Sequence, residues 1–483
     1  MTDLVTLRHL IGGERLAGKV ESSLRNPSDL SDTVTELLIG GTSEVDAAVF
    51  AARQAFNAWS GTSPLKRSDL LFAIAGGIRA HKARLASELS REEGKLLADA
   101  KAEATKAAQV FEFYAGQALR LDGEFGSRLA ADADVIVTRE PLGVIGLITP
   151  WNAPLAIVSW KLAPALMMGN AVVLKPSERA PVCVQSLIDI VLDAVMLVGA
   201  PVGLINMVHG AVQAGSALSG HAGIDALSFT GGTVAGRHIA VSVAARLLPV
   251  QLELGGKNPF VVSADADLET AISLVMFGAF AGAGQKCTAT SRIIVETAVA
   301  DAFIDKLTKK VSKFTVGRAD ALDVDMGPVI SAASKDNVAT VVRDAIAAGA
   351  EQVAMGHTVA RSVGHFAEPV LLLDDDSQSW LNQNEVFGPV ATIIRVADLD
   401  EAIAIANGTP FGLSSAIATQ SLKTARRFRR QSRAGIVAIN QATSGSDLHA
   451  PFEGIGQSGF GGAEQGAQAP HFFSRNKTAY VTG

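Results

Sequence analysis

The stretch that decides the fold runs from residue 143 to residue 178 and reads GVIGLITPWNAPLAIVSWKLAPALMMGNAVVLKPSE. Its two ends, 143–148 and 171–174, are short apolar runs rich in Val, Ile and Leu. Such runs are typical of strands that are buried on both faces. The residues between them predict a helix, and a strand, a helix and a second strand in this order predict a parallel βαβ unit.

The same alternation continues along the chain beyond this unit. Further strands are predicted, in chain order, at 203–208, 226–230, 258–262 and 291–295. Helical patterns separate them, and the segment 63–119, rich in Ala, Leu, Glu, Lys and Arg, is predicted to be almost wholly helical. The series restarts after Glu253, so two α/β halves meet near residue 251. The predicted fold class is α/β, with parallel sheets that carry helices on their faces.

Two further alternating segments stand apart from these halves. Residues 135–138 follow a charged linker and predict a strand at the edge of a sheet. Residues 477–481 predict a final strand, which ends the chain without a helix to cover it. We expect this last strand to pair with another strand, on this subunit or on a second one.

Length and composition exclude several classes of protein. The 483 residues suggest two or three domains, and 42 basic against 48 acidic side chains argue against a nucleic-acid partner held through its phosphates. The basic run at 423–433 is interpreted as a solvated helix face, with nucleic-acid binding as the less favoured alternative. Because only two cysteines occur, Cys183 and Cys287, a disulfide framework is excluded and a reducing, cytoplasmic compartment is expected. Residues 1–10 do not resemble a signal peptide.

An uncharged stretch at 141–160 is long enough to span a bilayer. It is interrupted by glycines and prolines, and a second uncharged stretch at 194–224 contains histidines and many glycines. Both stretches are therefore interpreted as buried parts of a large α/β core, and no membrane partner is expected.

Two residues have the chemistry that a catalytic site needs. Cys287 follows a turn of small residues that leaves its sulfur accessible, and the neighbouring Lys286 could help to stabilise a thiolate. A buried, inert cysteine is the alternative, and Cys183, which lies in an apolar run, is interpreted in that way. Glu253 is embedded in apolar residues, which raises a carboxyl pKa and suits a general base, with a paired structural carboxylate as the alternative. The nine histidines show no metal-ligand spacing, so no metal site is predicted.

Two turns that follow predicted strands could hold a nucleotide. Residues 228–237 are predicted to form a strand, a glycine turn and a helix start, where backbone N–H groups can hold a phosphate. The glycine spacing is not that of the ordinary dinucleotide fingerprint. Lys175 and Glu178 come directly after another strand, where they either reach ribose hydroxyls or pair with each other.

Motifs of several kinds follow one another along the chain. In order they are Thr149-Pro150-Trp151-Asn152, Lys175-Pro176-Ser177-Glu178, Phe229-Thr230-Gly231, Glu253-Leu254-Gly255-Gly256-Lys257, Gly284-Gln285-Lys286-Cys287, Glu385-Val386-Phe387-Gly388-Pro389, Asn407-Gly408-Thr409-Pro410-Phe411-Gly412-Leu413-Ser414 and Pro451-Phe452. In this combination the chain resembles the NAD(P)-dependent aldehyde dehydrogenase superfamily over essentially its whole length. The resemblance implies two Rossmann-like parallel α/β domains and a small β oligomerisation element.

This resemblance also implies a division of the chain and an assembly. The NAD(P)-binding domain would comprise 1–120 and 141–250, and the catalytic domain would comprise 251–445. The oligomerisation element and tail would comprise 121–140 and 446–483. A homodimer or homotetramer is expected, because strands of that element would extend a sheet across subunits.

The implied activity is the non-acylating oxidation of an aldehyde to a carboxylic acid with NAD(P)+. Cys287 would attack the aldehyde carbon and carry first a thiohemiacetal and then a thioester. Asn152 and the Cys287 backbone N–H would form the oxyanion hole, and Glu253 would activate the water that releases the acid. The alternatives are a catalytically silent structural protein of this fold, against which these three residues argue, and an acylating, coenzyme A-dependent relative, against which Glu253 argues.

The implied cofactor site is made by residues of both halves. They are Thr149, Pro150, Trp151, Lys175, Ser177, Glu178, Gly231, Gly232, Thr233, Gly236, Leu254, Glu385 and Phe387. Lys175 and Glu178 would hold the adenosine ribose, and Glu385 the nicotinamide ribose. Because Glu178 would bond a free 2′-hydroxyl and repel a 2′-phosphate, NAD is expected, with NADP as the alternative. Gly232 stands where many members have a serine, so one hydroxyl contact to the phosphate is missing.

The segments around Cys287 and at 442–452 resemble the subgroup that oxidises 2-oxoglutarate semialdehyde, so this or another semialdehyde is the expected substrate. The implied substrate pocket contains Trp160, Lys286, Thr288, Ser446, His449 and Phe452. Lys286, Thr288, Ser446 and His449 offer the cations and hydroxyls that a substrate carboxylate needs, and His449 is equally well interpreted as a solvated loop residue. Glu453 would repel an anionic substrate if it faced the pocket, which leaves uncharged aromatic or aliphatic aldehydes as the alternative.

Overall fold

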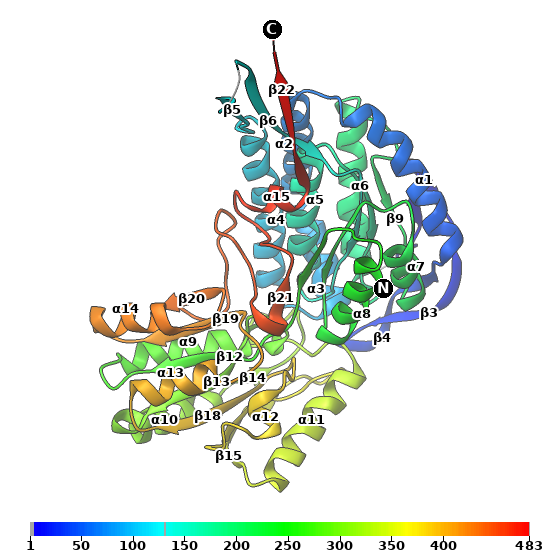
Figure 1. Cartoon of the computed structure of the whole chain (residues 1–483). Coiled ribbons are helices and arrows are strands. Elements are labelled where there is room, and N and C mark those ends of the chain that lie inside the picture. The colour runs from blue at the N-terminus through cyan, green and yellow to red at the C-terminus, as the bar shows by residue number, and fades with distance from the viewer. Residues whose placement is uncertain (1–3, 130–131, 483) are drawn as a thin grey trace.

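The largest sheet among the described residues is built mainly from the amino-terminal half of the chain (Figure 1). The computed structural model describes residues 4–129 and 132–482. The strands of this sheet are, in spatial order, β2 (Glu14–Leu16), β1 (His9–Ile11), β9 (Ile205–Met207), β8 (Ala171–Lys175), β7 (Val144–Ile148), β10 (Ala226–Thr230), β11 (Val250–Glu253) and β21 (Gly459–Phe460). The strands from β9 to β11 in this order are parallel, whereas β1, β2 and β21 are antiparallel additions at the two edges. The predicted α/β class and the strands predicted at 143–148, 171–174 and 226–230 are confirmed.

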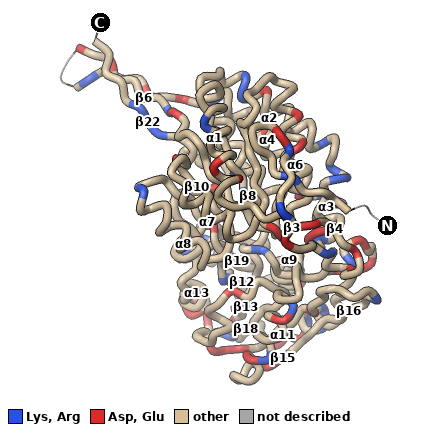
Figure 2. Tube along the Cα trace, turned by 90° about the vertical axis from the view of Figure 1, so that its right-hand side faces the viewer, with Lys and Arg blue, Asp and Glu red and all other residues tan. Residues whose placement is uncertain are grey.

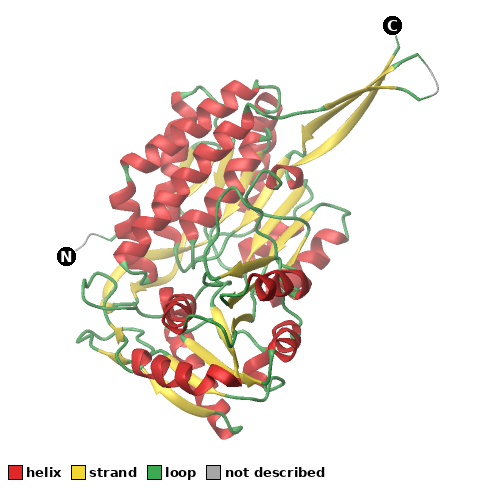
Figure 3. Ribbon diagram, turned by 90° about the vertical axis from the view of Figure 1, so that its left-hand side faces the viewer, coloured by secondary structure: helices red, strands yellow, loops and turns green. Residues whose placement is uncertain are grey.

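Helices surround this sheet (Figure 3). Those that lie against it are α1 (Thr42–Trp59), α5 (Pro154–Met167), α6 (Pro181–Leu197), α7 (Val212–Gly220) and α8 (Thr233–Ala244). A further layer, made of α2 (Pro64–Ala80), α3 (Lys82–Glu93) and α4 (Leu97–Ala118), packs on α5 and α6. Pro154 and Pro181 occupy the first positions of α5 and α6, where the missing N–H of proline costs no hydrogen bond. The strand-to-helix turns therefore lie immediately after β7 and β8.

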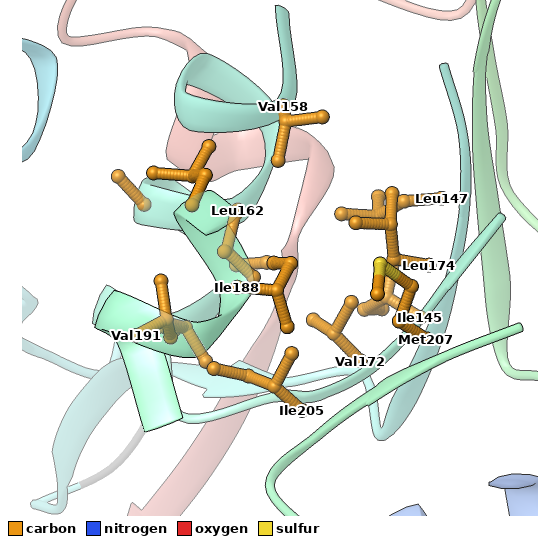
Figure 4. Close-up of a cluster of buried hydrophobic side chains, with 14 of the residues drawn as sticks. Ile145, Leu147, Val158, Leu162, Val172, Leu174, Ile188, Val191, Ile205 and Met207 are labelled. Carbon is orange, nitrogen blue, oxygen red and sulfur yellow. The ribbon is translucent and has the colours of Figure 1, made fainter. Parts of the chain in front are cut away.

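The core of this half lies between the sheet and the helices α5 and α6. Figure 4 shows side chains of β7, β8 and β9, among them Leu147, Leu174 and Met207, facing Val158 of α5 and Ile188 of α6. All five side chains are buried. Burial on both faces explains why β7 and β8 are continuous apolar runs rather than alternating ones.

The second sheet belongs to the carboxyl-terminal half. Its strands are, in spatial order, β15 (Glu351–Met355), β17 (Val370–Leu373), β18 (Val390–Val396), β13 (Thr290–Glu296), β12 (Asn258–Val262), β19 (Ser414–Ala418) and β20 (Ile436–Ile439). The helices of this half are α9 (Leu268–Phe280), α10 (Thr297–Val311), α11 (Ala332–Ala347), α12 (Trp380–Gln383), α13 (Leu399–Asn407) and α14 (Leu422–Gln431). Every pair in the sheet is parallel except β15 with β17, so this half is also an α/β layer structure.

The chain changes from one sheet to the other after Glu253. Strand β11 pairs in parallel with β10 up to the pair Thr230 and Glu253, and β12 of the second sheet begins at Asn258. The expected boundary between residues 250 and 251 therefore lies within β11. Glu253 is the last strand residue of the first sheet, and the short link that follows it leads directly into the second half.

A three-stranded antiparallel sheet projects from the rest of the chain (Figures 2 and 3). Its order is β22 (Ser474–Val481), β6 (Asp134–Pro141) and β5 (Glu124–Ser127). The strand predicted at 135–138 is thus the middle strand, and the prediction of an edge position was wrong, because β5 and β22 pair with its two sides. The final strand pairs within its own chain. The segment 446–483 is also shared between two sheets, because β21 joins the first one.

The remaining elements connect these layers. They are the antiparallel pair β3 (Lys19–Asn26) and β4 (Asp29–Ile39), the parallel pair β14 (Thr315–Val316) and β16 (His357–Thr358), and the short helix α15 (Ala469–Phe472). Among the described residues no helix is both long and apolar enough to cross a membrane. Over the same residues, no three His, Cys, Asp or Glu side chains are grouped so as to hold a metal ion.

Candidate active site

A cavity of about 380 Å³ lies at the carboxyl ends of the parallel strands of the first sheet. The turn after β7 contributes Pro150, Trp151 and Asn152, and the end of β11 contributes Glu253. The second half closes the cavity from the other side with Cys287 and further residues. Of the predicted catalytic and cofactor residues, those that line the cavity are Pro150, Trp151, Asn152, Gly231, Gly232, Glu253, Leu254, Cys287, Glu385 and Phe387.

Cys287 is presented by a tight turn that follows α9. Gly282, Ala283 and Gly284 have φ angles of 67°, 58° and 64°, in the left-handed region that favours glycine. A Cβ at Gly284 would also collide with the carbonyl of Gly388, so glycine is required there. The turn brings Cys287 to the cavity wall half-buried, with its carbonyl accepting a 2.8 Å hydrogen bond from Asn258 Nδ2.

The Cys287 thiol is held in its protonated form in this arrangement. Burial, together with the carboxylates of Glu253, Glu385 and Glu464, raises its pKa to about 12. Lys286, which was predicted to stabilise a Cys287 thiolate, is directed to another side chain. The Lys286 ammonium lies 5.1 Å from the ring centroid of Phe277 on α9, and burial lowers its own pKa. A thiol of this kind needs a base or a nearby positive charge before it becomes nucleophilic.

Asn152 is fixed next to the cysteine turn by two hydrogen bonds. Its Nδ2 donates to the Gln285 carbonyl at 3.1 Å, and its own carbonyl accepts from Lys95 Nζ at 2.7 Å. Because an amide NH₂ has two N–H donors, one donor of Asn152 remains for a ligand beside Cys287.

Lys95 is itself part of a buried charged cluster. Its ammonium lies 2.5 Å from a carboxylate oxygen of Glu103, and the other oxygen of Glu103 accepts from the backbone N–H groups of Leu155 and Ala156 at 2.9 and 3.2 Å. These N–H groups belong to the first turn of α5, where a carboxylate is favoured by the helix dipole. The Asn152 turn is thereby anchored from α4.

Glu253 is buried, and no described side chain forms a hydrogen bond or ion pair with its carboxylate oxygens, although the Gly454 backbone N–H is close enough to oppose the rise in its pKa. Burial raises its pKa well above the ordinary value, and the nearby carboxylate of Glu464 raises it further. Lys161, which forms a buried ion pair with Glu464, opposes this shift. Glu253 is therefore an unpaired buried carboxyl facing the cavity that contains Cys287, and the alternative of a paired structural carboxylate was wrong.

The predicted nucleotide residues surround the same cavity. Helix α8 begins with Gly232 as its cap, without a side-chain hydrogen bond to the exposed N–H groups of the first turn. Nothing lies within 4 Å of the position that a Gly232 Cβ would take, so this helix start is open to a phosphate. At the other side, Glu385 accepts from Gly256 N–H at 3.2 Å, and burial raises its pKa to about 7. The Glu385 carboxylate lies directly against Gly255, where a Cβ would displace it.

Two aromatic rings stand at the cavity wall. Trp151 and Phe387 meet edge to face, with ring centroids 5.5 Å apart and planes at 83°. Phe387 has a φ of 54°, which is rare for a large side chain. Such strained conformations persist where the surroundings over-determine them, as they do at ligand sites.

The other predicted cofactor residues lie near the cavity without lining it. Lys175, at the end of β8, pairs with Glu178 at 3.3 Å, and Ser177 accepts a 3.3 Å hydrogen bond from the Arg179 backbone N–H. Thr149 is buried, and its hydroxyl has no partner among the described residues. Thr233 is the first residue of α8, and Gly236 packs against the side chain of Leu254.

The predicted substrate residues do not form one group. Trp160 and Phe452 stack, with ring centroids 5.8 Å apart and planes at 29°. Thr288 is buried, and its carbonyl accepts from the Thr443 hydroxyl at 2.8 Å. His449 is exposed, as is Glu453. The interpretation of His449 as a solvated loop residue is the one that the structure favours.

Three lining residues, Thr230, Gly255 and Val386, lie in the motifs quoted above without having been assigned a role. The lining residues that the sequence analysis missed are Ile157, Arg179, Ala333, Ser334 and Asn337. Arg179 directly follows the motif at 175–178, so that motif could have indicated it. Asn337 lies on α11, whose sequence carries no distinctive pattern, and only the folded arrangement brings it to the cavity.

Comparison with known proteins agrees with this geometry. A family model described as the aldehyde dehydrogenase family matches residues 17–479. The chain is 36% identical to the alpha-ketoglutaric semialdehyde dehydrogenase of Bacillus subtilis, over 100% of this chain and 99% of that one. It is also 36% identical to the betaine aldehyde dehydrogenase of the same organism, over 98% of each. The crystal structure of betaine aldehyde dehydrogenase from Staphylococcus aureus in complex with NAD+ superposes with a TM-score of 0.94 at 33% identity, covering 98% of this chain and 94% of that one.

Proposed function

The chain belongs to the aldehyde dehydrogenase family, and on this basis we propose that Cys287, Glu253 and Asn152 are the catalytic residues with which it oxidises an aldehyde to a carboxylic acid. The observation that carries the assignment is the cavity itself. It brings a half-buried cysteine, a buried unpaired carboxyl and a side-chain amide together, although they are distant in the sequence.

The chemistry of each residue follows from its surroundings. The Cys287 thiol first loses its proton to water, and Sγ then attacks the aldehyde carbon to give a thiohemiacetal, whose oxyanion accepts hydrogen bonds from the free N–H of Asn152 and from the Cys287 backbone N–H. Because the oxyanion hole is held by Lys95 and Gln285, it needs little rearrangement during the reaction. After oxidation Cys287 carries a thioester. Glu253, whose raised pKa makes it a stronger base, takes a proton from the water that releases the acid.

The enzyme uses NAD(P)+ as the hydride acceptor, which is the chemistry that this cofactor supplies when bound. In our proposal Gly231, Gly232 and the start of α8 hold the pyrophosphate, since this helix terminus is open and uncapped. Glu385 and the Lys175–Glu178 pair hold the two riboses, and Trp151 and Phe387 line the nicotinamide end. Pro150 and Leu254 line the same cavity, and Thr149, Ser177, Thr233 and Gly236 support these contacts from the turns after β7 and β8 and from α8.

The substrate proposed is 2-oxoglutarate semialdehyde or another aldehyde that carries a carboxylate. This is supported by the similarity to the Bacillus subtilis alpha-ketoglutaric semialdehyde dehydrogenase. The test is a comparison of kcat/KM for 2-oxoglutarate semialdehyde, succinic semialdehyde, benzaldehyde and hexanal, followed by NADH absorbance. A preference for either uncharged aldehyde would contradict the proposed substrate class.

The choice between NAD and NADP is expected to depend on Glu178. Its carboxylate is partly exposed and pairs with Lys175, so it repels a 2′-phosphate through a screened interaction. Replacing Glu178 by Thr is therefore expected to raise the ratio of kcat/KM for NADP to that for NAD by about tenfold. Glu14→Thr, on the exposed edge strand β2, is the control. A wild-type enzyme that already prefers NADP would show that Lys175 dominates the ribose site instead.

The assembly and the compartment are part of the proposal. The sheet of β5, β6 and β22 projects from the subunit with exposed side chains such as Phe125 and Tyr480, which supports its use in a homodimer or homotetramer. We place the change from the cofactor domain to the catalytic domain after Glu253, where the chain passes between the sheets. Both cysteines are unpaired, which is consistent with a cytoplasmic location.

A further inference from the structure

We propose that Lys106 on α4 binds the remote carboxylate of the substrate and thereby makes the enzyme select anionic over cationic aldehydes. The inference rests on the proposed function, because it assigns the group that recognises the far end of a semialdehyde. Lys106 was not among the residues that the sequence indicated.

The position of Lys106 follows from the packing of α4 against α5. Glu103 of α4 accepts from the N–H groups of Leu155 and Ala156 at the start of α5. Lys106 lies three residues further along α4, and its ammonium is 5.7 Å from the ring centroid of Trp160 on α5. Trp160 is in turn three residues after Ile157, which lines the cavity, so both side chains lie on one face of α5 a single turn apart. Lys106 therefore lies one helical turn beyond the wall of the catalytic cavity.

The hydrogen bonds of Lys106 leave it able to bind an anion. Its ammonium donates to the carbonyl and the hydroxyl of Ser446, each at 2.8 Å, which uses two of its three N–H donors. Within residues 4–129 and 132–482 the structure contains no ion pair of Lys106. The two carboxylates that act on it are Glu103, which already bonds Lys95 and the start of α5, and the exposed Asp447.

The neighbouring Lys95 is a buried lysine whose charge is balanced by ion pairs, and it serves as a comparison for Lys106. Glu103 and Glu93 raise the pKa of Lys95 even though it is buried. Burial instead lowers the pKa of Lys106, because the carboxylates of Glu103 and Asp447 compensate only in part for the lost water. A partly buried ammonium without a counter-ion would be stabilised by a carboxylate that the substrate brings.

Trp160 provides a second free donor at this place. Its side chain is 7% exposed, and its indole N–H has no acceptor among the described residues. A carboxylate that contacted Lys106 could accept from this N–H as well, so that both donors would be satisfied at once. The ring of Phe452, stacked on Trp160, supplies an apolar wall for the carbon chain of the substrate.

The two cations that the sequence suggested for this role are less suitable. Lys286 is directed to Phe277 on α9, and His449 is exposed to solvent. The positive charge of Lys106 also repels a cationic aldehyde. A trimethylammonium group could otherwise bind the face of an aromatic ring such as Trp160, and the ammonium of Lys106 already occupies the neighbourhood of that ring. Betaine aldehyde should therefore be a poor substrate.

The test compares Lys106→Met with the wild type on three aldehydes that differ in charge. Methionine keeps the unbranched chain and removes the charge and the donors. We expect kcat/KM for succinic semialdehyde to fall by about tenfold or more, mainly through KM, because a charge-assisted hydrogen bond is lost. For hexanal we expect a change of less than about threefold, since no charged partner is removed. For betaine aldehyde we expect kcat/KM to rise, because a repulsion is relieved.

Two further variants distinguish a loss of substrate-carboxylate binding from a local loss of structure. Lys106→Arg keeps the charge and is expected to restore most of the discrimination between succinic semialdehyde and hexanal. Lys101→Met makes the same substitution at an exposed position of α4 and is expected to leave all three values unchanged. Equal losses on all three aldehydes in Lys106→Met would overturn the proposal, because they would mean that Lys106 only anchors the loop through Ser446.

The outcome also distinguishes this proposal from the one on which it rests. A wild-type enzyme that prefers hexanal would contradict the proposed substrate class and the role of Lys106 together. A wild-type enzyme that prefers succinic semialdehyde, and keeps that preference in Lys106→Met, would contradict the role of Lys106 alone.

Discussion

Cys287→Ala is expected to lower NADH formation by about four orders of magnitude or more, because no other group at the cavity can form the thioester. The change removes a single atom from a half-buried side chain, so folding and NAD binding should be nearly intact. The measurement is steady-state NADH absorbance, combined with thermal unfolding and with NAD titration followed by quenching of the fluorescence of Trp151, which lines the cavity.

The matched control for this variant is Cys183→Ala. Cys183 is fully buried at the start of α6, away from the cavity wall, so its replacement should cost some stability but leave turnover unchanged. If Cys287→Ala kept a tenth or more of the wild-type turnover, Cys287 would not be the nucleophile. Loss of activity in both variants would instead indicate damage to the fold.

Glu253→Gln is expected to separate the two half-reactions. Glutamine fills the same space but cannot accept a proton from water, so the thioester on Cys287 should form once and then accumulate. The expected time course is a burst of about one NADH per enzyme molecule. It is followed by a steady rate that is lower than that of the wild type by about two to four orders of magnitude. Rapid-mixing absorbance measures both phases, and Glu351→Gln, at an exposed glutamate of the edge strand β15, is the control.

The same variant should remove a pH dependence of the wild type. Burial raises the pKa of Glu253 in the folded enzyme, so this carboxyl loses its proton, and can act as a base, at a higher pH than an ordinary glutamate does. Steady-state turnover should therefore rise as the pH rises through that pKa, and the residual rate of Glu253→Gln should lack this rise. A variant without any burst would mean that Glu253 is needed earlier, to take the proton from Cys287, whose own pKa is also raised.

The strands of the parallel sheets could be predicted because their signal is local. β7 and β8 are short runs of branched apolar residues between turns, and any chain that buries both faces of a strand needs such runs. The position of β6 within its sheet was predicted wrongly. Alternation along β6 indicates a strand with two different faces, but the number of neighbours depends on β5 and on β22, which arrives from the far end of the chain.

The catalytic residues were indicated by the sequence for a related reason. Cys287, Glu253 and Asn152 lie in motifs whose glycines and prolines are required by the local backbone, as at Gly284, where a Cβ would collide with Gly388. The motifs could not show how readily Cys287 and Glu253 lose their protons. The raised pKa values of Cys287 and Glu253 arise from burial and from Glu464, which is distant in the chain.

The sequence by itself determined the α/β class, the order of the strands along the chain and the motifs that meet at the cavity, because each of these depends on local backbone requirements or on short runs of buried residues. Only the tertiary structure decided what the charged residues of α4 do. Lys101, Glu103 and Lys106 are equally compatible with a solvated helix face, and a helical pattern does not distinguish them. The packing of α4 on α5 leaves Lys101 in water, brings Glu103 to the start of α5 and brings Lys106 to Trp160. Their different roles follow from which neighbours replace the water around each charge, and those neighbours come from other parts of the chain.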